Sequence, residues 1–453
     1  MGTTIKKAAP YTLFSNQDLK KLIVPLVIEQ ALVLMVGMVD TMMIASLGEA
    51  AMSGVSLVDM INGLLINVFA ALSTGGAVVV SQYIGAKKQK EANASTTQLI
   101  FVALAVSLVV MVVCLWQHSA IIRLFFGSIE DDVMASCQSY FFITSLSFPF
   151  LSVISACAAV FRSIGRSKVT MYASLLSNAL NVVGNAIFIY VIPFGVAGAA
   201  GATVFSRFAA MLMLLVLLTN KRNMVFIDFK QKFRLQWDVV KRILYVGIPS
   251  GIENSLFSLG RVMVVGFIST FGTVQIAANA VANNLDGLGC VPGGALNLAM
   301  ITVAGQCIGA GDLGQTKYYI KKLMKITHLL HFGWNMFLFV LLPFILGFYN
   351  LSPETHSLTW ILIGIHNGIG SFLWPVSFTL PNALRAGNDV RYTMVVAVSS
   401  MFAFRILFSY VLGIVLGLGA IGVWIAMILD WICRIICWLL RYKSGKWLKY
   451  KAD

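Results

Sequence analysis

The chain has 453 residues, of which 58% are hydrophobic and 11% charged, with a formal net charge of +15. Soluble proteins carry far more charge, so this composition excludes an ordinary soluble enzyme and indicates a protein that crosses a membrane many times. The basic residues stand in short clusters between apolar runs, which indicates membrane topology rather than nucleic-acid binding.

Twelve apolar windows are long enough to cross a hydrocarbon core about 30 Å thick as helices of roughly 20 residues. They fall near residues 22–46, 52–83, 93–117, 134–161, 168–192, 195–218, 239–269, 275–307, 317–347, 355–384, 391–416 and 418–440. The predicted fold class is an all-α membrane protein whose twelve transmembrane helices form two pseudo-symmetric six-helix lobes. The seven cysteines are odd in number and scattered, which indicates neither a disulfide framework nor a zinc site.

The boundaries between these windows alternate between basic segments and segments almost free of Lys and Arg. The basic boundaries include both chain ends, with Lys6, Lys7, Lys20 and Lys21 at one and residues 441–451 at the other. The opposite boundaries include the acidic segment Glu130-Asp131-Asp132. The positive-inside rule therefore predicts a multi-pass protein of the inner (plasma) membrane with both termini in the cytoplasm.

Motifs of the first half recur in the second half at a nearly constant offset. Three pairs show it: Pro25 and Glu29 with Pro249 and Glu253 (249 − 25 = 224), Gln82 and Gly85 with Gln306 and Gly309 (306 − 82 = 224), and Arg162 with Arg385 (385 − 162 = 223). Each half holds an even number of helices, so the halves are predicted to be parallel repeats about an axis along the membrane normal. We expect lobes at residues 1–219 and 239–453, joined by a basic cytoplasmic linker at 220–238.

Several motifs carry a resemblance to a known family. They are Val39-Asp40-Thr41 in the first helix, Gln-x-x-Gly-Ala at the ends of the second and eighth helices, and Leu384-Arg385-Ala386-Gly387 after the tenth. With the repeat and the twelve-helix plan, the chain resembles the multidrug and toxic compound extrusion (MATE) family. The resemblance implies a V-shaped monomer with a central cleft and no cofactor. It also implies export of small organic, often cationic compounds in exchange for Na⁺ or H⁺.

Asp40 is the leading candidate for ion coupling, because an ionisable group at membrane depth is costly. The predicted fifth helix carries Asn178, Asn181 and Asn185 on one face, and Asn185 lies at about the depth of Asp40. One carboxylate with amide oxygens suits either a weakly held Na⁺ or a carboxylate whose protonation is the coupling event.

The resemblance implies a cation or proton site in the N-terminal lobe at these positions, with Thr203 of the sixth helix beside them. Other family members have an aspartate where this chain has Asn185, which weakens a mechanism with two carboxylates. The alternative role for Asp40 is to pin two helices together, and asparagines commonly hold helices together by hydrogen bonds. Val264 stands at the position equivalent to Asp40 (40 + 224 = 264), so coupling is expected mainly in the N-terminal lobe.

Four further charged residues are predicted to serve substrate binding or gating: Glu29, Glu253, Arg261 and Asp59. Glu29 lies toward the cytoplasm from Asp40, and Glu253 is its repeat equivalent. Asp59 is expected to face the outer vestibule, with pairing to Asp40 as the alternative.

Two pairs at similar depth, Arg261 with Asp286 and Arg405 with Asp430, are expected to form neutralising ion pairs.

Other classes of function stay open with less support. A flippase or exporter of a lipid-linked or polyanionic substrate shares the architecture, but only Arg261 and Arg405 are recognised at mid-depth. A membrane enzyme is disfavoured, because His328, His331 and His366 stand isolated on apolar helices. A primary pump lacks a P-loop motif, and a channel fits two chemically different lobes less well than alternating access does.

Overall fold

The computed structural model describes residues 13–127, 129–228, 234–349 and 351–449, and the regular structure in those ranges is helical throughout. Lys6, Lys7, Lys451 and residues 229–233 of the linker lie outside the described residues.

The first half of the chain folds into seven α-helices. They are α1 (Asn16–Ala45), α2 (Glu49–Gly85), α3 (Gln89–Phe126), α4 (Asp131–Ser145), α5 (Phe148–Ser163), α6 (Ser167–Ala186) and α7 (Gly195–Leu218). A π-helical segment (Ile187–Val191) extends α6. Ser15 caps α1 and exchanges hydrogen bonds with Asp18, so this helix begins where its sequence supplies a capping box.

The second half repeats this plan with more breaks. Its α-helices are α8 (Trp237–Ser269), α9 (Thr273–Gly289), α10 (Val291–Gly309), α11 (Leu313–Gly347), α12 (Pro353–Ile363), α13 (Ser371–Trp374), α14 (Leu380–Ala386), α15 (Val390–Ser400) and α16 (Gly419–Lys443). Four π-helical segments, Gly364–Gly370, Pro375–Thr379, Met401–Ile406 and Ser409–Val415, continue α12, α13 and α15.

The membrane spans agree with the prediction of twelve. Within the described residues, eleven spans are long and apolar enough to cross a membrane, and the bent pair α4 and α5, at 49°, makes the twelfth. Two windows expected as single helices are broken, at Leu146–Ser147 and at Cys290. The second break lies beside Pro292, where the missing backbone N–H of proline makes a helix start favourable.

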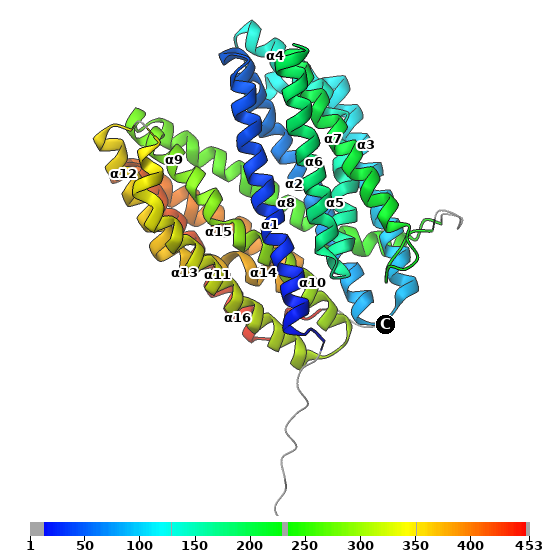
Figure 1. Cartoon of the computed structure of the whole chain (residues 1–453). Coiled ribbons are helices and arrows are strands. Elements are labelled where there is room, and N and C mark those ends of the chain that lie inside the picture. The colour runs from blue at the N-terminus through cyan, green and yellow to red at the C-terminus, as the bar shows by residue number, and fades with distance from the viewer. Residues whose placement is uncertain (1–12, 128, 229–233, 350, 450–453) are drawn as a thin grey trace, which may run out of the picture.

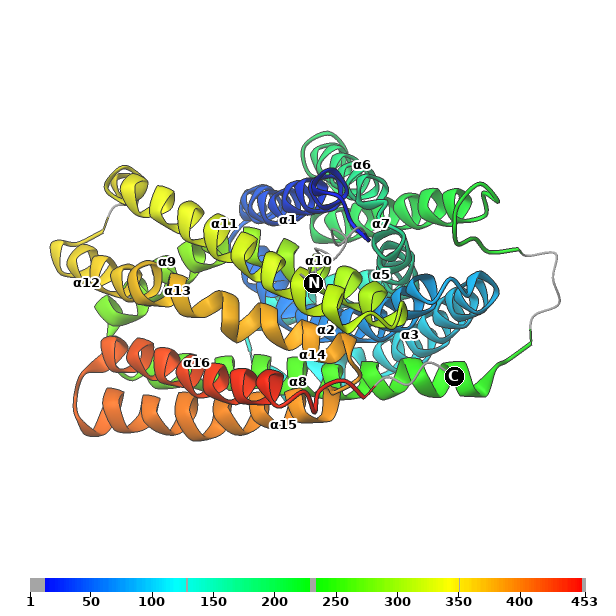
Figure 2. The same cartoon turned by 90° about the horizontal axis from the view of Figure 1, so that it is seen from below.

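The helices form two bundles that diverge like a V (Figure 1). In that view α3 to α7 lie to the right and α9, α11 to α13 and α16 to the left, and the two groups separate toward the end that holds α4 and α12. Seen from the converging end, α2, α8 and α10 lie between the two groups (Figure 2), and α2 packs along both α8 and α10.

Two helices reach across to the opposite bundle at the converging end. The first turns of α1 place Leu19, Leu22 and Leu26 in a buried cluster with residues of α10, α11 and α14. The first turns of α8 place Val240 and Ile243 in a cluster with residues of α2, α3 and α5. Each lobe therefore packs against the first turns of one helix from the other half of the chain.

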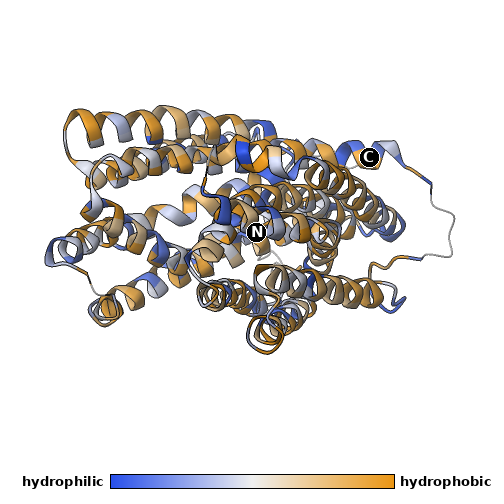
Figure 3. Ribbon diagram, turned by 90° about the horizontal axis from the view of Figure 1, so that it is seen from above, coloured by the Kyte–Doolittle hydropathy of each residue, from blue (hydrophilic) through white to orange (hydrophobic). Residues whose placement is uncertain are grey.

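Hydrophobic residues make up most of the helical ribbon (Figure 3). Large apolar side chains such as Trp116, Leu124 and Val340 are 75% to 83% exposed in the isolated chain. Exposed apolar surface on this scale indicates contact with lipid rather than with water.

Candidate functional site

Asp40 meets the asparagine-bearing face of α6 near the end of α1 where the lobes diverge. The Asn185 amide donates a hydrogen bond to Asp40 Oδ1. The Asn181 amide satisfies both of its neighbours when its nitrogen faces Asp40 and its oxygen faces Thr203. In this orientation the nitrogen donates to Asp40 Oδ1 at 2.8 Å and the oxygen accepts from Thr203 Oγ1 at 3.1 Å. Three of the residues predicted to accompany Asp40, namely Asn181, Asn185 and Thr203, therefore lie together with it.

The polar set around Asp40 is incompletely satisfied. Asn185 Oδ1 is buried without a hydrogen-bond partner. In the described part of the chain, no Lys, Arg or His forms an ion pair with Asp40 within 4.0 Å. Asn178, predicted as a third member, makes no hydrogen bond to this set in the described structure, and its buried Nδ2 has no partner.

Two residues that sequence reasoning missed surround this set. Arg207 of α7 donates from Nη1 to Ser147 Oγ at 2.7 Å and lies within electrostatic range of both Asp40 and Asp59. Tyr140 of α4 is only 5% exposed and lies beside Thr203. Arg207 stands in the middle of an apolar helix, four residues after Thr203, and that position was the signal available in the sequence.

Asp59 takes an exposed position on α2. Its Oδ1 accepts a long contact from the Asn62 amide at 3.5 Å. It lies within electrostatic range of Asp40, although the structure shows no hydrogen bond between these two carboxyl groups. The two acids therefore share one electrostatic environment with Arg207.

The two glutamates near the converging end each hold an arginine. Arg162 Nη1 lies 3.5 Å from Glu29 Oε1, and Thr170 Oγ1 donates to Glu29 Oε2 at 2.5 Å. In the second half, Arg385 Nη2 donates to Glu253 Oε1 at 2.6 Å. The repeat in the sequence thus corresponds to a repeated ion pair.

A cavity adjoins each of these ion pairs. The one that contains Glu29 and Arg162 measures about 190 Å³, and the one that contains Glu253 and Arg385 measures about 300 Å³. Both are lined by Thr74, Leu298 and Ile301, so the two cavities lie against each other at the lobe interface. The larger one also takes aromatic rings from Phe257, Phe378 and Trp438.

Helices α2 and α10 cross in close contact below these cavities. A Cβ atom added at Gly85 would lie 1.9 Å from the backbone oxygen of Gln306, and one added at Gly309 would lie 1.9 Å from that of Gln82. The glycines of the two Gln-x-x-Gly-Ala motifs therefore permit a backbone approach that no other residue allows.

The predicted pairs Arg261–Asp286 and Arg405–Asp430 are wrong. Asp286 Oδ1 instead lies 2.6 Å from His366 Nε2, and Arg434 Nε lies 2.9 Å from Asp430 Oδ1. His366 is therefore not isolated, and the count of arginines at mid-depth was too low, since it left out Arg207 and Arg434. Equal depth is not enough for pairing, because the rotation of each helix about its axis also decides which side chains meet.

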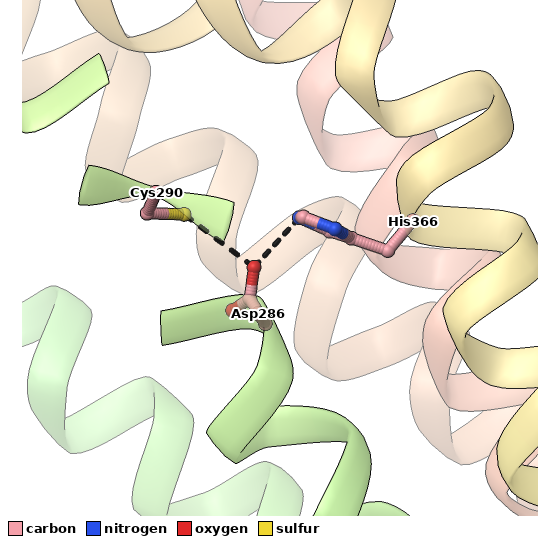
Figure 4. Close-up of side chains that lie close together, drawn as sticks. All are labelled: Asp286, Cys290 and His366. Carbon is pink, nitrogen blue, oxygen red and sulfur yellow. Dashed lines mark hydrogen bonds and ion pairs between the residues drawn. The ribbon is translucent and has the colours of Figure 1, made fainter. Parts of the chain in front are cut away.

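Asp286 also lies beside a cysteine, with its carboxylate between Cys290 and His366 (Figure 4). The Cys290 Sγ to Asp286 Oδ1 distance is 3.5 Å, and one donor atom from each of the three residues lies within 4.8 Å of the others. These are metal-ligand residue types that the scattered cysteine pattern did not suggest. The 2.6 Å distance between the carboxylate and the imidazole is within ion-pair range.

Comparison with known proteins decides the family. The MatE family model matches residues 25–187 and again residues 249–411, so the second match begins 249 − 25 = 224 residues after the first. The chain belongs to the MATE family.

Relatives cover the chain almost completely. This MATE chain is 26% identical to the uncharacterized transporter YisQ of Bacillus subtilis, over 99% of its own length and 98% of the relative's. It is 26% identical to a probable multidrug resistance protein NorM of Thermotoga maritima, over 97% of each. A solved structure described as the outward-facing conformation of a multidrug resistance MATE family transporter aligns with a TM-score of 0.87 at 20% identity, covering 96% of this chain and 97% of that one.

Membership establishes the general function. The protein is a multi-pass membrane transporter of the multidrug efflux type with the two-lobe MATE fold, and its relatives are transporters rather than enzymes. The two matched segments are also separated, at their starts and at their ends, by the offset that the sequence motifs indicated.

Proposed function

We propose that this MATE transporter exports small organic cations in exchange for Na⁺ or H⁺ that enters at Asp40. The observation that supports this most is a carboxylate at membrane depth that contacts amides of α6 and has no ion-pair partner in the described structure. A carboxylate in that position responds strongly to a bound cation or a proton, because little else neutralises its charge.

The oxygen atoms beside Asp40 suit a weakly bound monovalent cation. Asn185 Oδ1 is a buried acceptor without a partner, so a cation bound by Asp40 would also satisfy it. Na⁺ takes such hard oxygen ligands, whereas H⁺ needs only the carboxylate. Both ions therefore remain in the proposal, and the test below separates them.

Helix α1 connects this ion site with the opposite lobe. Its outer part contacts α6 through Asp40, while its cytoplasmic half packs on α10 and α11. Neutralising Asp40 weakens its hydrogen bonds with the amides of α6 and so shifts α1 against the C-terminal lobe. A change of about 3 kcal/mol in this contact shifts a two-state equilibrium more than 100-fold.

The substrate is proposed to meet the glutamates at the lobe interface. Glu253 Oε2 is buried without a partner beside the cavity of about 300 Å³, and aromatic rings line the same space. An acceptor beside aromatic rings suits an organic cation that carries a donor N–H. Glu29 and Glu253, through their ion pairs with arginines, also close the path toward the cytoplasm. Asp59 lies nearer the open end of the V. We assign that end to the outside because both termini are predicted to be cytoplasmic.

Uptake of a fluorescent cation such as ethidium into everted vesicles tests this proposal, with the sodium and proton gradients imposed separately. Asp40→Asn should abolish ion-driven uptake while the protein stays folded in the membrane. Glu49→Gln is the matched control, because Glu49 is an exposed acid in the first turn of α2 and forms no hydrogen bond or ion pair in the described part of the chain. Undiminished uptake by Asp40→Asn would exclude Asp40 from coupling, and the gradient that drives the wild type identifies the ion.

A further inference from the structure

Two arginines within the membrane form no ion pair with any carboxylate that the structure describes. In the described part of the chain, Arg261 of α8 and Arg405 of the π-helical segment after α15 form no ion pair within 4.0 Å and no hydrogen bond. Arg405 Nε is buried, and its guanidinium lies 5.7 Å from the centre of the Phe257 ring. Arg261 is exposed and Arg405 is half-buried. Positive charge at membrane depth is costly without a counter-charge, so these two neighbouring groups favour binding of an anion.

A cavity of about 60 Å³ lies between these arginines. Asn279, Asn283 and Trp424 supply the rest of its polar lining. The acceptors of Asn279 are already used, because Trp424 Nε1 donates to its Oδ1 at 3.0 Å and Asn283 Nδ2 donates to its backbone oxygen at 2.9 Å. The groups left to face a ligand are mainly the guanidinium donors, and the cavity has room for a few heavy atoms.

The surrounding charge also favours an anion. Five charged side chains interact here: Arg261, Arg405, Arg434, Asp286 and Asp430. Their charges sum to 3 − 2 = +1 when the adjacent His366 is neutral. A single negative group in the cavity would bring this cluster to neutrality.

A cluster in the N-terminal lobe has a net charge of the opposite sign at a similar depth. It consists of Arg207, Asp40 and Asp59, whose charges sum to 1 − 2 = −1. Arg261 lies 269 − 261 = 8 residues from the end of α8 and Asp59 lies 59 − 49 = 10 residues from the start of α2. At 1.5 Å per residue these are about 12 Å and 15 Å from the diverging ends of their helices.

We propose that the cavity between Arg261 and Arg405 binds a single anionic group of carboxylate size, and that the preferred substrates are zwitterions whose carboxylate enters this cavity. This inference rests on the proposed export function and narrows its substrate class. Guanidinium groups bind carboxylates through charge-assisted hydrogen bonds, which are about twice as strong as neutral ones.

Calorimetry on the full-length transporter in nanodiscs tests this with two probes, the zwitterion norfloxacin and its methyl ester, which retains only the cationic amine. The wild type should bind the zwitterion more tightly than the ester. Arg261→Gln should weaken zwitterion binding about tenfold and leave ester binding unchanged. Because Arg261 is exposed, this variant should fold, and Arg405→Gln is the second variant. Lys443→Gln, an exposed charge at the other end of α16, is the control.

Repeating the binding measurement with sodium chloride in place of sodium gluconate shows whether the cavity also takes a free anion or selects the carboxylate of the substrate. If chloride weakens binding of the zwitterion and not of the ester, a free anion enters the same cavity. If chloride affects neither, the cavity selects the carboxylate of the substrate. Absent binding of the zwitterion, equal affinities for the two probes, or an equal loss of both in Arg261→Gln would overturn the proposal.

The binding measurement needs no ion gradient, so it is independent of the coupling proposal. Asp40→Asn should keep the difference between the two probes even though driven uptake is lost. Retained uptake by Asp40→Asn would refute coupling and leave the anion site intact, whereas probes that bind equally would refute the anion site alone.

Discussion

Gln82 and Gln306 form the same contact in opposite directions across the lobe interface. Gln82 Nε2 donates to the backbone oxygen of Ala386 at 2.8 Å, and Gln306 Nε2 donates to that of Ser163 at 2.6 Å. The two acceptors are themselves repeat equivalents, since 386 − 163 = 223. The sequence repeat therefore corresponds to two equivalent hydrogen bonds, at the end of the molecule where α2 and α10 cross.

Gly309→Ala should open this crossing. Its Cβ would lie 1.9 Å from the backbone oxygen of Gln82, a distance that forces the two helices apart. Cys307, two residues before Gly309 and fully buried, should then react faster with a membrane-permeant maleimide in a variant that lacks the other cysteines. Gly266→Ala, where nothing lies within 4 Å, is the control. An unchanged rate in Gly309→Ala would show that the added methyl group does not separate the two helices.

Glu253→Gln should lower the thermal stability of the purified transporter more than Glu29→Gln. Glu253 relies on Arg385 at 2.6 Å, whereas Glu29 has a longer ion pair of 3.5 Å and a second, neutral partner in Thr170. Breaking a buried ion pair on one side costs about 3 to 5 kcal/mol. A thermal series followed by size-exclusion chromatography measures the loss. Equal losses in the two variants would mean that the ion-pair geometry does not set their stability.

Asn185→Asp should shift coupling toward protons. Asn185 contacts Asp40, and two carboxyl groups in contact cannot both stay ionised, so the pair would hold a proton. Everted vesicles with a pH gradient and no sodium gradient should show increased uptake relative to the wild type. Asn178→Asp is the control, because Asn178 makes no hydrogen bond with Asp40 in the described structure. The same ion preference in the wild type and in Asn185→Asp would contradict this role for the contact.

Leu26→Ala should destabilise the protein because Leu26 helps to hold α1 against the opposite lobe. Leu26 is 0% exposed in the cluster where α1 packs on the opposite lobe. Truncating such a side chain costs about 2 to 5 kcal/mol, because a cavity remains. Val24→Ala, at a site that is 46% exposed, should change thermal stability little. If the two variants melt alike, this half of α1 does not hold the lobes together.

Depth along the membrane normal was predictable from sequence, but the contacts at that depth were predictable only in part. Asn181 and Asn185 were expected beside Asp40 because family resemblance and helical spacing both placed them there, and they contact it. The partner of Asp286 was not predictable, since Arg261 and His366 are both accessible at its depth and only the packing of the helices selects His366.

The sequence by itself determined the number of spans, their alternating direction and the repeat. Each follows from local physics: about 20 apolar residues cross the hydrocarbon core, basic loops stay in the cytoplasm, and a motif such as Gln82-x-x-Gly85 can be compared with its copy without any structure. Only the tertiary structure decided that α1 and α8 pack on their opposite lobes and that two expected helices break. It also decided that Arg261 and Arg405 form no ion pair with a carboxylate in the described part of the chain. These features depend on how each helix is rotated and tilted against its neighbours, which is a sum of many small packing contacts that no single motif encodes.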